Sequence, residues 1–248
     1  MSLLTLRDLT VTRGACPVVD RVSFAVEPSE IVGLIGPNGA GKTTLMRGAL
    51  GLLPARGESS LAALSARERA KAVAWMPQSR EIAWPVTVET LVTLGRIPHL
   101  PAGPRDRAAV EEALARLDLL PFRDRKATEL SGGEQARVLL ARVLAQETPL
   151  ILADEPIAGL DPAHQIATME TFRDLAAEGR AVLVALHDLG LAARHCTRLV
   201  LMERGRLVAD GRPGEVLTEA NLRAHFNVRA RFEETPDGPV FQLLERVA

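Results

Sequence analysis

The chain has 248 residues, of which 47% are hydrophobic and 25% charged, and its formal net charge is −1. This composition is that of a globular protein, and the balanced charge gives no overall attraction to nucleic acid or anionic lipid. Cys16 and Cys196 are too few for a disulfide framework and lack metal-ligand spacing, which favours a reduced, cytoplasmic setting. Charges interrupt every apolar stretch before it reaches the roughly 20 residues of a membrane span. We therefore expect a soluble chain that reaches a membrane only by docking.

Short apolar runs alternate with helical patterns along most of the chain, which predicts an α/β fold. The first two runs, 3–11 and 18–26, have no helix between them and predict an antiparallel β layer. Further strands are predicted at 31–35, 150–153, 181–186 and 198–202. The last of these strands should turn at Arg204-Gly205 into a hairpin.

Helical patterns dominate from about residue 88 to 144. They predict a helical subdomain inserted between two parts of one catalytic α/β core, approximately 1–87 and 145–212. We expect one domain that spans 1–248.

The stretch from about 213 to 248 is expected to be a tail packed on the core. It carries a short helix signal at 218–226 and then a hairpin signal with a turn at Asp237-Gly238.

A glycine-rich turn follows the strand predicted at 31–35 and opens a helix, which is the context of a P-loop. The pattern GxxxxGK[ST] is matched by Gly36, Pro37, Asn38, Gly39, Ala40, Gly41, Lys42 and Thr43, and Thr44 follows them. The glycines let backbone N–H groups converge on a β-phosphate, and Lys42 adds a cation at the β- and γ-phosphates. The Thr43 hydroxyl is a candidate Mg²⁺ ligand. A glycine-rich turn without chemical importance is the alternative, and the full match in context argues against it.

Two acids, Asp154 and Glu155, end the strand predicted at 150–153, where ligands of parallel sheets bind. Asp154 suits the outer coordination sphere of Mg²⁺, and Glu155 suits the positioning of a water against a γ-phosphate. His187 ends another strand and is expected to reach the same phosphate. Without other signals, two acids at a strand end are more often simply solvated, and a single histidine is more often structural. The P-loop in the same chain is what favours a catalytic role for these residues. Gln78, at the end of an apolar run, carries no weight by itself.

The stretch LSGGEQARVLLARVLA begins at Leu130 and predicts a helix whose first turn holds an anion. Ser131, Gly132 and Gly133 are small, and free N–H groups with the positive end of the helix dipole are expected there. A second phosphate site is unexpected in a chain that already has a P-loop.

The order GPNGAGKT, Gln78, LSGGE, LILADEP, AGLD and His187 resembles the ATP-binding subunit of an ATP-binding cassette (ABC) transporter over nearly the whole chain. The resemblance implies a P-loop NTPase (RecA-like) fold and an ATPase that uses Mg²⁺. It makes Gln78 the glutamine that senses Mg²⁺ and the transmembrane partner. Asp154 is then the acid on the Mg²⁺ side, Glu155 the catalytic carboxylate and His187 the switch histidine.

The resemblance also resolves the second anion site. It implies that two copies dimerise head to tail around ATP, so that Ser131, Gly132 and Gly133 meet the γ-phosphate held by the other copy's Lys42. Residues 159–161 fall in the loop that communicates between subunits.

A narrower resemblance is carried by WPVTVETLVTLGRIPHL, from Trp84, and by LSGGEQARVLLARVLAQ. Both are similar to importer ATPases for iron–siderophore complexes, haem or cobalamin, in which the region of 93–99 touches the coupling helix of the permease. The implied partners are an integral-membrane permease and, indirectly, a periplasmic or extracellular substrate-binding protein. The implied location is the cytoplasmic face of the inner (cell) membrane, and nucleic acid is not an expected partner. Manganese, zinc and molybdate remain alternative cargoes.

The sequence departs from the family at three places. Arg13 stands where the family usually stacks an aromatic ring on adenine; a guanidinium can also stack on a base, so weaker or altered adenine contact is expected. Ile157-Ala158 replaces the usual Thr-Ser and removes two hydroxyls near the inter-subunit loop. Ala136 replaces a polar residue and should be tolerated on a helix.

ABC ATPases outside transport are the rival interpretation. Those of DNA repair carry a long coiled coil, and those of translation resemble tandem cassettes; this chain shows neither sustained heptads nor a second P-loop. A single cassette with an importer-like insert favours an importer subunit.

Overall fold

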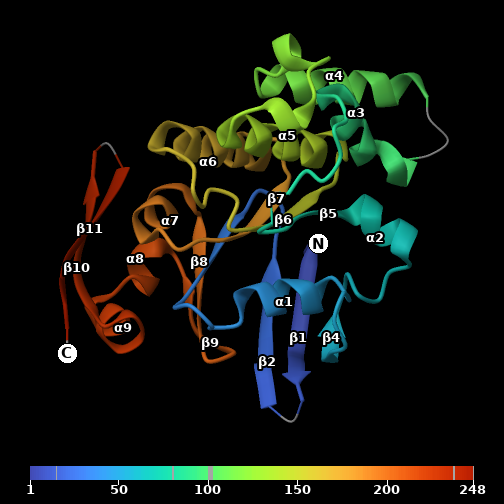
Figure 1. The fold of residues 1–248 in the computed structure, drawn as a ribbon. Helices are drawn as coiled ribbons and strands as arrows, with labels where there is room; N and C mark the ends of the chain where they lie inside the picture. The colour runs from blue at the N-terminus through green and yellow to red at the C-terminus, as the bar shows by residue number, and fades with distance from the viewer. Residues whose placement is uncertain (15, 80, 100–102, 237, 248) are drawn as a thin grey trace.

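The structure is a computed structural model that describes residues 1–14, 16–79, 81–99, 103–236 and 238–247. A six-stranded sheet forms its centre (Figure 1). In spatial order the strands are β5 (Val73–Met76), β6 (Leu150–Asp154), β7 (Ala181–Ala185), β3 (Ile31–Ile35), β8 (Arg198–Glu203) and β9 (Arg206–Gly211). The first five pair in parallel, and every residue of β3, β6 and β7 is buried, as expected where both faces of a parallel sheet are covered.

The predicted hairpin between β8 and β9 is confirmed. Glu203 pairs with Arg206, and the turn residues Arg204 and Gly205 have φ angles of 47° and 80°. Positive φ at both central residues is what a two-residue turn of this kind needs.

The predicted N-terminal antiparallel layer is also confirmed. It consists of β1 (Leu4–Arg13), β2 (Cys16–Val26) and β4 (Arg56–Ser59), in the order β2-β1-β4. Its apolar side chains share one core cluster with α1 (Lys42–Ala49) and with one face of the central sheet. The layer therefore supports the helix that follows the glycine-rich turn.

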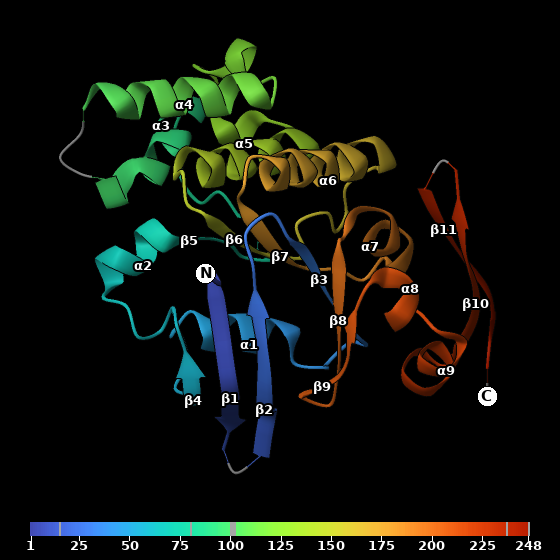
Figure 2. The same ribbon diagram turned by 180° about the vertical axis from the view of Figure 1, so that it is seen from behind.

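Helices cover the other face of the central sheet. A second core cluster joins this face to α5 (Gly132–Ala145), α6 (Pro162–Ala177) and α7 (Leu189–His195). The elements between β5 and β6 lie together at the end of the molecule away from β1, β2 and β4 (Figures 1 and 2). They are α3 (Val88–Thr93), a 3-10 helix (Leu94–His99), α4 (Pro104–Arg116), two 3-10 turns (Leu120–Phe122 and Ala127–Glu129) and α5. A short helix, α2 (Ala66–Ala72), precedes β5.

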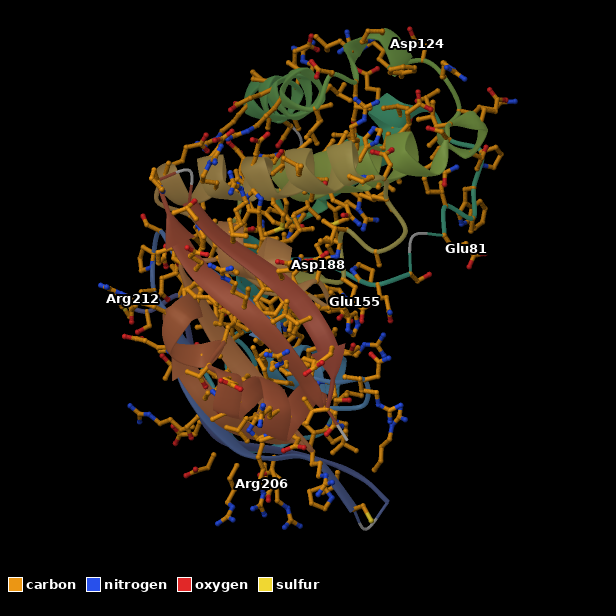
Figure 3. All side chains as sticks on the ribbon, turned by 90° about the vertical axis from the view of Figure 1, so that its left-hand side faces the viewer. Glu81, Asp124, Glu155, Asp188, Arg206 and Arg212 are labelled. Carbon is orange, nitrogen blue, oxygen red and sulfur yellow. The ribbon has the colours of Figure 1, made fainter. Side chains whose placement is uncertain are left out.

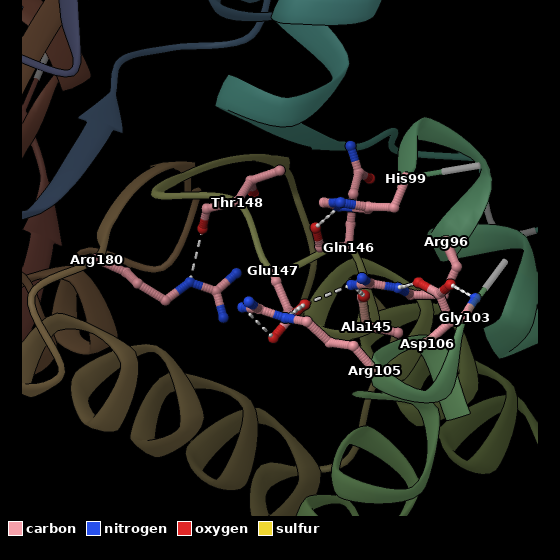
Figure 4. Close-up of polar contacts among 10 residues, drawn as sticks. All are labelled: Arg96, His99, Gly103, Arg105, Asp106, Ala145, Gln146, Glu147, Thr148 and Arg180. Carbon is pink, nitrogen blue, oxygen red and sulfur yellow. Dashed lines mark hydrogen bonds and ion pairs between the residues drawn. The ribbon is translucent and has the colours of Figure 1, made fainter. Parts of the chain in front are cut away.

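A buried arginine joins the parts of this helical region (Figure 4). Arg96, only 4% exposed, donates to Asp106 at 2.7 Å, to the carbonyl of Ala145 at 2.6 Å and to Glu147 at 2.7 Å. Asp106 also accepts from the amide of Gly103 at 2.6 Å. These contacts tie the 3-10 helix to the start of α4 and the end of α5.

The C-terminal stretch packs on α7. It forms α8 (Pro213–Val216), α9 (Glu219–Asn221), a π-helical turn (Leu222–Phe226) and the hairpin of β10 (Val228–Thr235) and β11 (Gly238–Arg246). Phe232 and Phe241 are paired across the hairpin and pack against the core. Of the predicted turn, Asp237 lies outside the described residues. In the described ranges, no helix has the length and apolarity to cross a membrane.

Candidate active site

A pocket of about 350 Å³ opens at the carboxyl ends of β3, β6 and β7. It is lined by residues 38–44, Arg13, Val18, Glu155 and His187. Figure 3 shows Glu155 at a height between the helices above and the N-terminal strands below. The structure thus gathers most of the predicted site residues in one place.

The glycine-rich turn has the backbone shape that the P-loop pattern predicts. Gly36 has a φ of 146°, and a Cβ atom there would lie 2.1 Å from the carbonyl oxygen of Met202. Lys42, the first residue of α1, folds back so that its ammonium donates to the carbonyls of Gly36 at 2.7 Å and Pro37 at 3.3 Å. Burial lowers the pKa of Lys42, while the carboxylates of Glu155 and Asp154 oppose that effect. The loop therefore holds a cation where phosphate oxygens would replace the carbonyls as partners.

Thr43 and Asp154 form the part of the site that suits a divalent cation. The Thr43 hydroxyl donates to Asp154 Oδ1 at 3.2 Å, and Asp154 is fully buried. Burial raises the pKa of Asp154, and the bond from Thr43 acts against it. The second oxygen, Oδ2, is buried without a hydrogen-bond partner among the described residues.

This donor set fits Mg²⁺ that is bound mainly through nucleotide phosphates. Such Mg²⁺ uses one or two protein oxygens and keeps several waters. Among the described residues no group of three or more His, Cys, Asp or Glu side chains is placed to hold a metal ion alone. An orphaned carboxylate oxygen beside a hydroxyl is therefore consistent with a cation that arrives with its nucleotide.

Two other predicted site residues, Gln78 and His187, contact the carboxylate of Glu155. Its Oε2 accepts from the Gln78 amide at 2.8 Å, and its Oε1 contacts His187 Nε2. Its backbone, at a left-handed φ of 51°, donates to the carbonyl of Ala185 at 3.2 Å. The carboxylate is 15% exposed and His187 43% exposed, so a water molecule has access to the group. The structure brings Gln78, Glu155 and His187 together.

Arg13 reaches the pocket from the end of β1 and lies on the antiparallel layer. Its exposed side chain borders the same cavity as residues 38–44. The contact of Arg13 with adenine stays a prediction.

The segment of Ser131, Gly132 and Gly133 does not line this pocket. It starts α5 with Ser131 as the N-cap, and Ser131 and Gly132 are exposed. The expectation of a free amide at Ser131 is wrong, because this amide donates to Glu134 at 2.7 Å. Glu134 also accepts from the Ser131 hydroxyl, and these two bonds lower the pKa of Glu134. The sequence signal was the Ser-x-x-Glu spacing of a capping box.

Comparison with known proteins gives the class. Residues 19–158 match the family model described as ABC transporter, and the chain belongs to this family. The order of motifs in the sequence and the geometry of the pocket agree with that membership.

Relatives within the family are import proteins by name. The chain is 41% identical over 246 residues to the hemin import ATP-binding protein HmuV of Pseudomonas entomophila, covering 95% of this chain and 96% of the relative. It is 42% identical over 242 residues to the cobalamin import ATP-binding protein BtuD of Halobacterium salinarum, covering 94% of this chain. The matched region spans only 61% of the length of that cobalamin relative.

Solved structures share the fold. A chain of a metal-chelate type ABC transporter in an inward-facing conformation matches with a TM-score of 0.85 at 24% identity, covering 98% of this chain and 97% of that one. An ATP-binding subunit of an ABC transporter matches with a TM-score of 0.79 at 28% identity, covering 90% and 95%. The predicted P-loop NTPase core with an antiparallel layer and inserted helices is confirmed.

Proposed function

We propose that this chain is the ATP-hydrolysing subunit of an ABC importer that takes up a metal chelate. The observation that carries the proposal is that Lys42, Thr43, Glu155 and His187 line one pocket, with Asp154 bonded to Thr43 and Gln78 bonded to Glu155 beside it. The reaction is phosphoryl transfer from ATP to water, in which positioning and charge neutralisation supply most of the acceleration.

Each residue has a proposed part in that reaction. The turn 36–41 and Lys42 bind the β- and γ-phosphates, Thr44 adds to the same cradle, and Arg13 contacts adenine. Glu155 orients the attacking water and takes up its proton, while Gln78 and His187 hold the carboxylate in position. Mg²⁺, when bound, neutralises phosphate charge, with Thr43 and Asp154 holding it and Gln78 nearby.

The active form is proposed to be a head-to-tail dimer. Ser131, Gly132 and Gly133 are exposed or half-exposed at the start of α5 and lie outside the P-loop pocket of their own chain. The first-turn amides of a helix have no intrahelical acceptor and attract anions. A second copy can supply the γ-phosphate that they bind.

The permease is proposed to dock on the helical region at the cytoplasmic face of the inner (cell) membrane. Trp84, before α3, and Leu94 and Ile97, on the 3-10 helix, are 74%, 45% and 58% exposed, which leaves these large apolar side chains available to a protein partner. A periplasmic or extracellular binding protein would deliver the cargo to that permease. The helical region then corresponds to the inserted subdomain of about 88–144.

Haem and cobalamin are the cargoes named for the relatives, and an iron–siderophore complex belongs to the same chemical class. The test is uptake into inverted or reconstituted vesicles that contain the permease and binding protein encoded by neighbouring genes. Haem, cobalamin and a ferric siderophore are offered separately. We expect ATP-dependent uptake of one of them, and none with Glu155→Gln. If only manganese, zinc or molybdate were taken up, the cargo would not be a metal chelate. If the chain copurified with no permease, a non-transport ABC ATPase would be favoured.

A further inference from the structure

His164 connects two segments that the proposed dimer places at its interface. It is the third residue of α6, and its imidazole lies against Gly133 in the first turn of α5. A Cβ atom added at Gly133 would lie 3.3 to 3.4 Å from Cε1, Nδ1 and Nε2 of the ring. Because three ring atoms are equally close, the ring presents its face to the space that the glycine leaves open.

The same imidazole holds Asp161 on its other side. Nδ1 lies 2.6 Å from Asp161 Oδ2, and the backbone amide of His164 donates to Asp161 Oδ1 at 3.0 Å. The backbone bond and then the side-chain bond lower the pKa of Asp161, so its carboxylate is ionised at neutral pH. An ionised carboxylate only accepts hydrogen bonds, so Nδ1 carries a proton and donates it.

We propose that His164 is a positioning residue that makes segment 131–133 and loop 159–161 move as one unit when ATP joins two copies. The inference rests on the proposed function, which assigns the first segment to the partner's γ-phosphate, and on the resemblance that places residues 159–161 in the loop that communicates between subunits. A packed ring and a charge-assisted hydrogen bond give a short, direct connection between the two. Binding of phosphate at α5 is thereby coupled to the placement of Asp161.

Capping of α6 does not require the ring contact. Asp161 already caps the helix through the backbone amide of His164. Beyond this backbone cap, the imidazole contributes the hydrogen bond from Nδ1 and the packing of its ring beside Gly133. A substitution can remove one of these two contributions and keep the other. In His164→Asn the side-chain amide can still donate to Asp161, but the ring face is lost.

The test compares His164→Ala and His164→Asn, each in a Glu155→Gln background. The matched control is His225→Ala, since His225 forms a similar pair with Glu203 at 2.8 Å, away from the pocket. The readout is the ATP concentration that gives half-maximal dimer in light scattering. We expect both His164 variants to raise it about three- to tenfold, the scale of coupling between residues in contact. The control should leave it unchanged.

A second readout uses the nucleotide-free chain and does not depend on dimerisation. Hydrogen exchange should become faster at both 131–135 and 159–161 in His164→Ala, with ATP binding by the monomer unchanged. The inference would be overturned if His164→Asn matched the parent in both dimerisation and hydrogen exchange, or if His164→Ala sped up exchange at 159–161 alone. Either result would mean that His164 only helps to cap α6. If Glu155→Gln itself forms no dimer with ATP, the proposed function fails, while the exchange result still decides the role of His164.

Discussion

The side-chain amide of Gln78 donates to the carboxylate of Glu155 at 2.8 Å. The two residues follow β5 and β6, which pair in parallel with Met76 opposite Ala153. Gln78 also leads into the segment that enters the helical region. A displacement of that segment therefore changes the hydrogen bonding of the carboxylate proposed to orient water.

Gln78→Ala should lower kcat for ATP hydrolysis about three- to tenfold, because Glu155 loses one of the side chains that orient it. The Kd for ATP should remain within about twofold, since Gln78 does not line the P-loop pocket. Steady-state kinetics and calorimetry measure the two quantities. Gln78→Glu places a like charge beside Glu155 and should be at least as severe; a kcat equal to that of the parent in both variants would contradict the account.

Arg13→Ala should weaken ATP binding about three- to tenfold, the scale of a cation–π contact of roughly 1 kcal/mol. Isothermal titration calorimetry with the monomer measures this change. The control is Arg7→Ala, because Arg7 lies on the same strand and pairs with Glu58 at 3.6 Å without lining the pocket. Equal nucleotide affinity of Arg13→Ala and the parent would remove Arg13 from the site.

Ser131→Arg should leave ATP binding by the monomer nearly intact and abolish ATP-driven dimerisation and hydrolysis. The long side chain would occupy the space that the partner's γ-phosphate needs. Ser65→Arg is the matched control, because Ser65 and Glu68 form the same capping box at the start of α2. Both variants lose a cap, worth about 1 kcal/mol, so only a difference in dimerisation between them reports on the interface.

Arg96→Met should lower the free energy of unfolding by about 3 kcal/mol, the scale for removing one partner of a buried ion pair. Urea denaturation measures this loss. Arg223→Met is the control, because its pair with Glu219 is exposed and should change stability by less than about 1 kcal/mol. Equal losses in the two variants would show that the network in Figure 4 does not stabilise the helical region.

The same network predicts a pH dependence. The Gly103 amide, and then the Arg96 guanidinium, hold the pKa of Asp106 below its usual value of 3.8. Because the pKa of Asp106 is lower in the folded state, its ionised carboxylate stabilises the fold above the usual pKa. This stabilisation is lost as the pH falls through the lower, folded-state pKa. The free energy of unfolding of the parent should therefore fall more steeply below about pH 4 than that of Arg96→Met. Parallel curves would contradict this assignment.

Local patterns predicted much of the fold. The buried strands, the hairpin at Arg204-Gly205 and the P-loop each rest on residues that are close in sequence. Within the helical pattern predicted from about residue 88, α3 ends at Thr93 and a 3-10 helix follows from Leu94. There a Cβ at Gly95 would lie 2.2 Å from the carbonyl oxygen of Arg142, so the close approach of α5 shapes this segment.

Contacts between distant segments could not be predicted in the same way. Nothing local to Gln78 indicated its bond to Glu155, because that bond depends on which strand lies beside β6. The packing of His164 on Gly133 likewise depends on how α6 and α5 cross. The subdomain boundaries and the roles of the individual site residues stay predictions.

The central claim is that Glu155 orients the water that attacks ATP at a site completed by a second copy. Glu155→Gln keeps the size of the side chain and removes its charge, so ATP binding should persist and the ATP-bound dimer should accumulate. Turnover should fall at least about a hundredfold, the scale for loss of a general base. Glu234→Gln, on the exposed hairpin, should hydrolyse ATP like the parent. The decisive measurement is ATP hydrolysis by Glu155→Gln together with its oligomeric state in Mg²⁺–ATP: a trapped dimer with little turnover is predicted, and turnover equal to that of the parent would contradict the account.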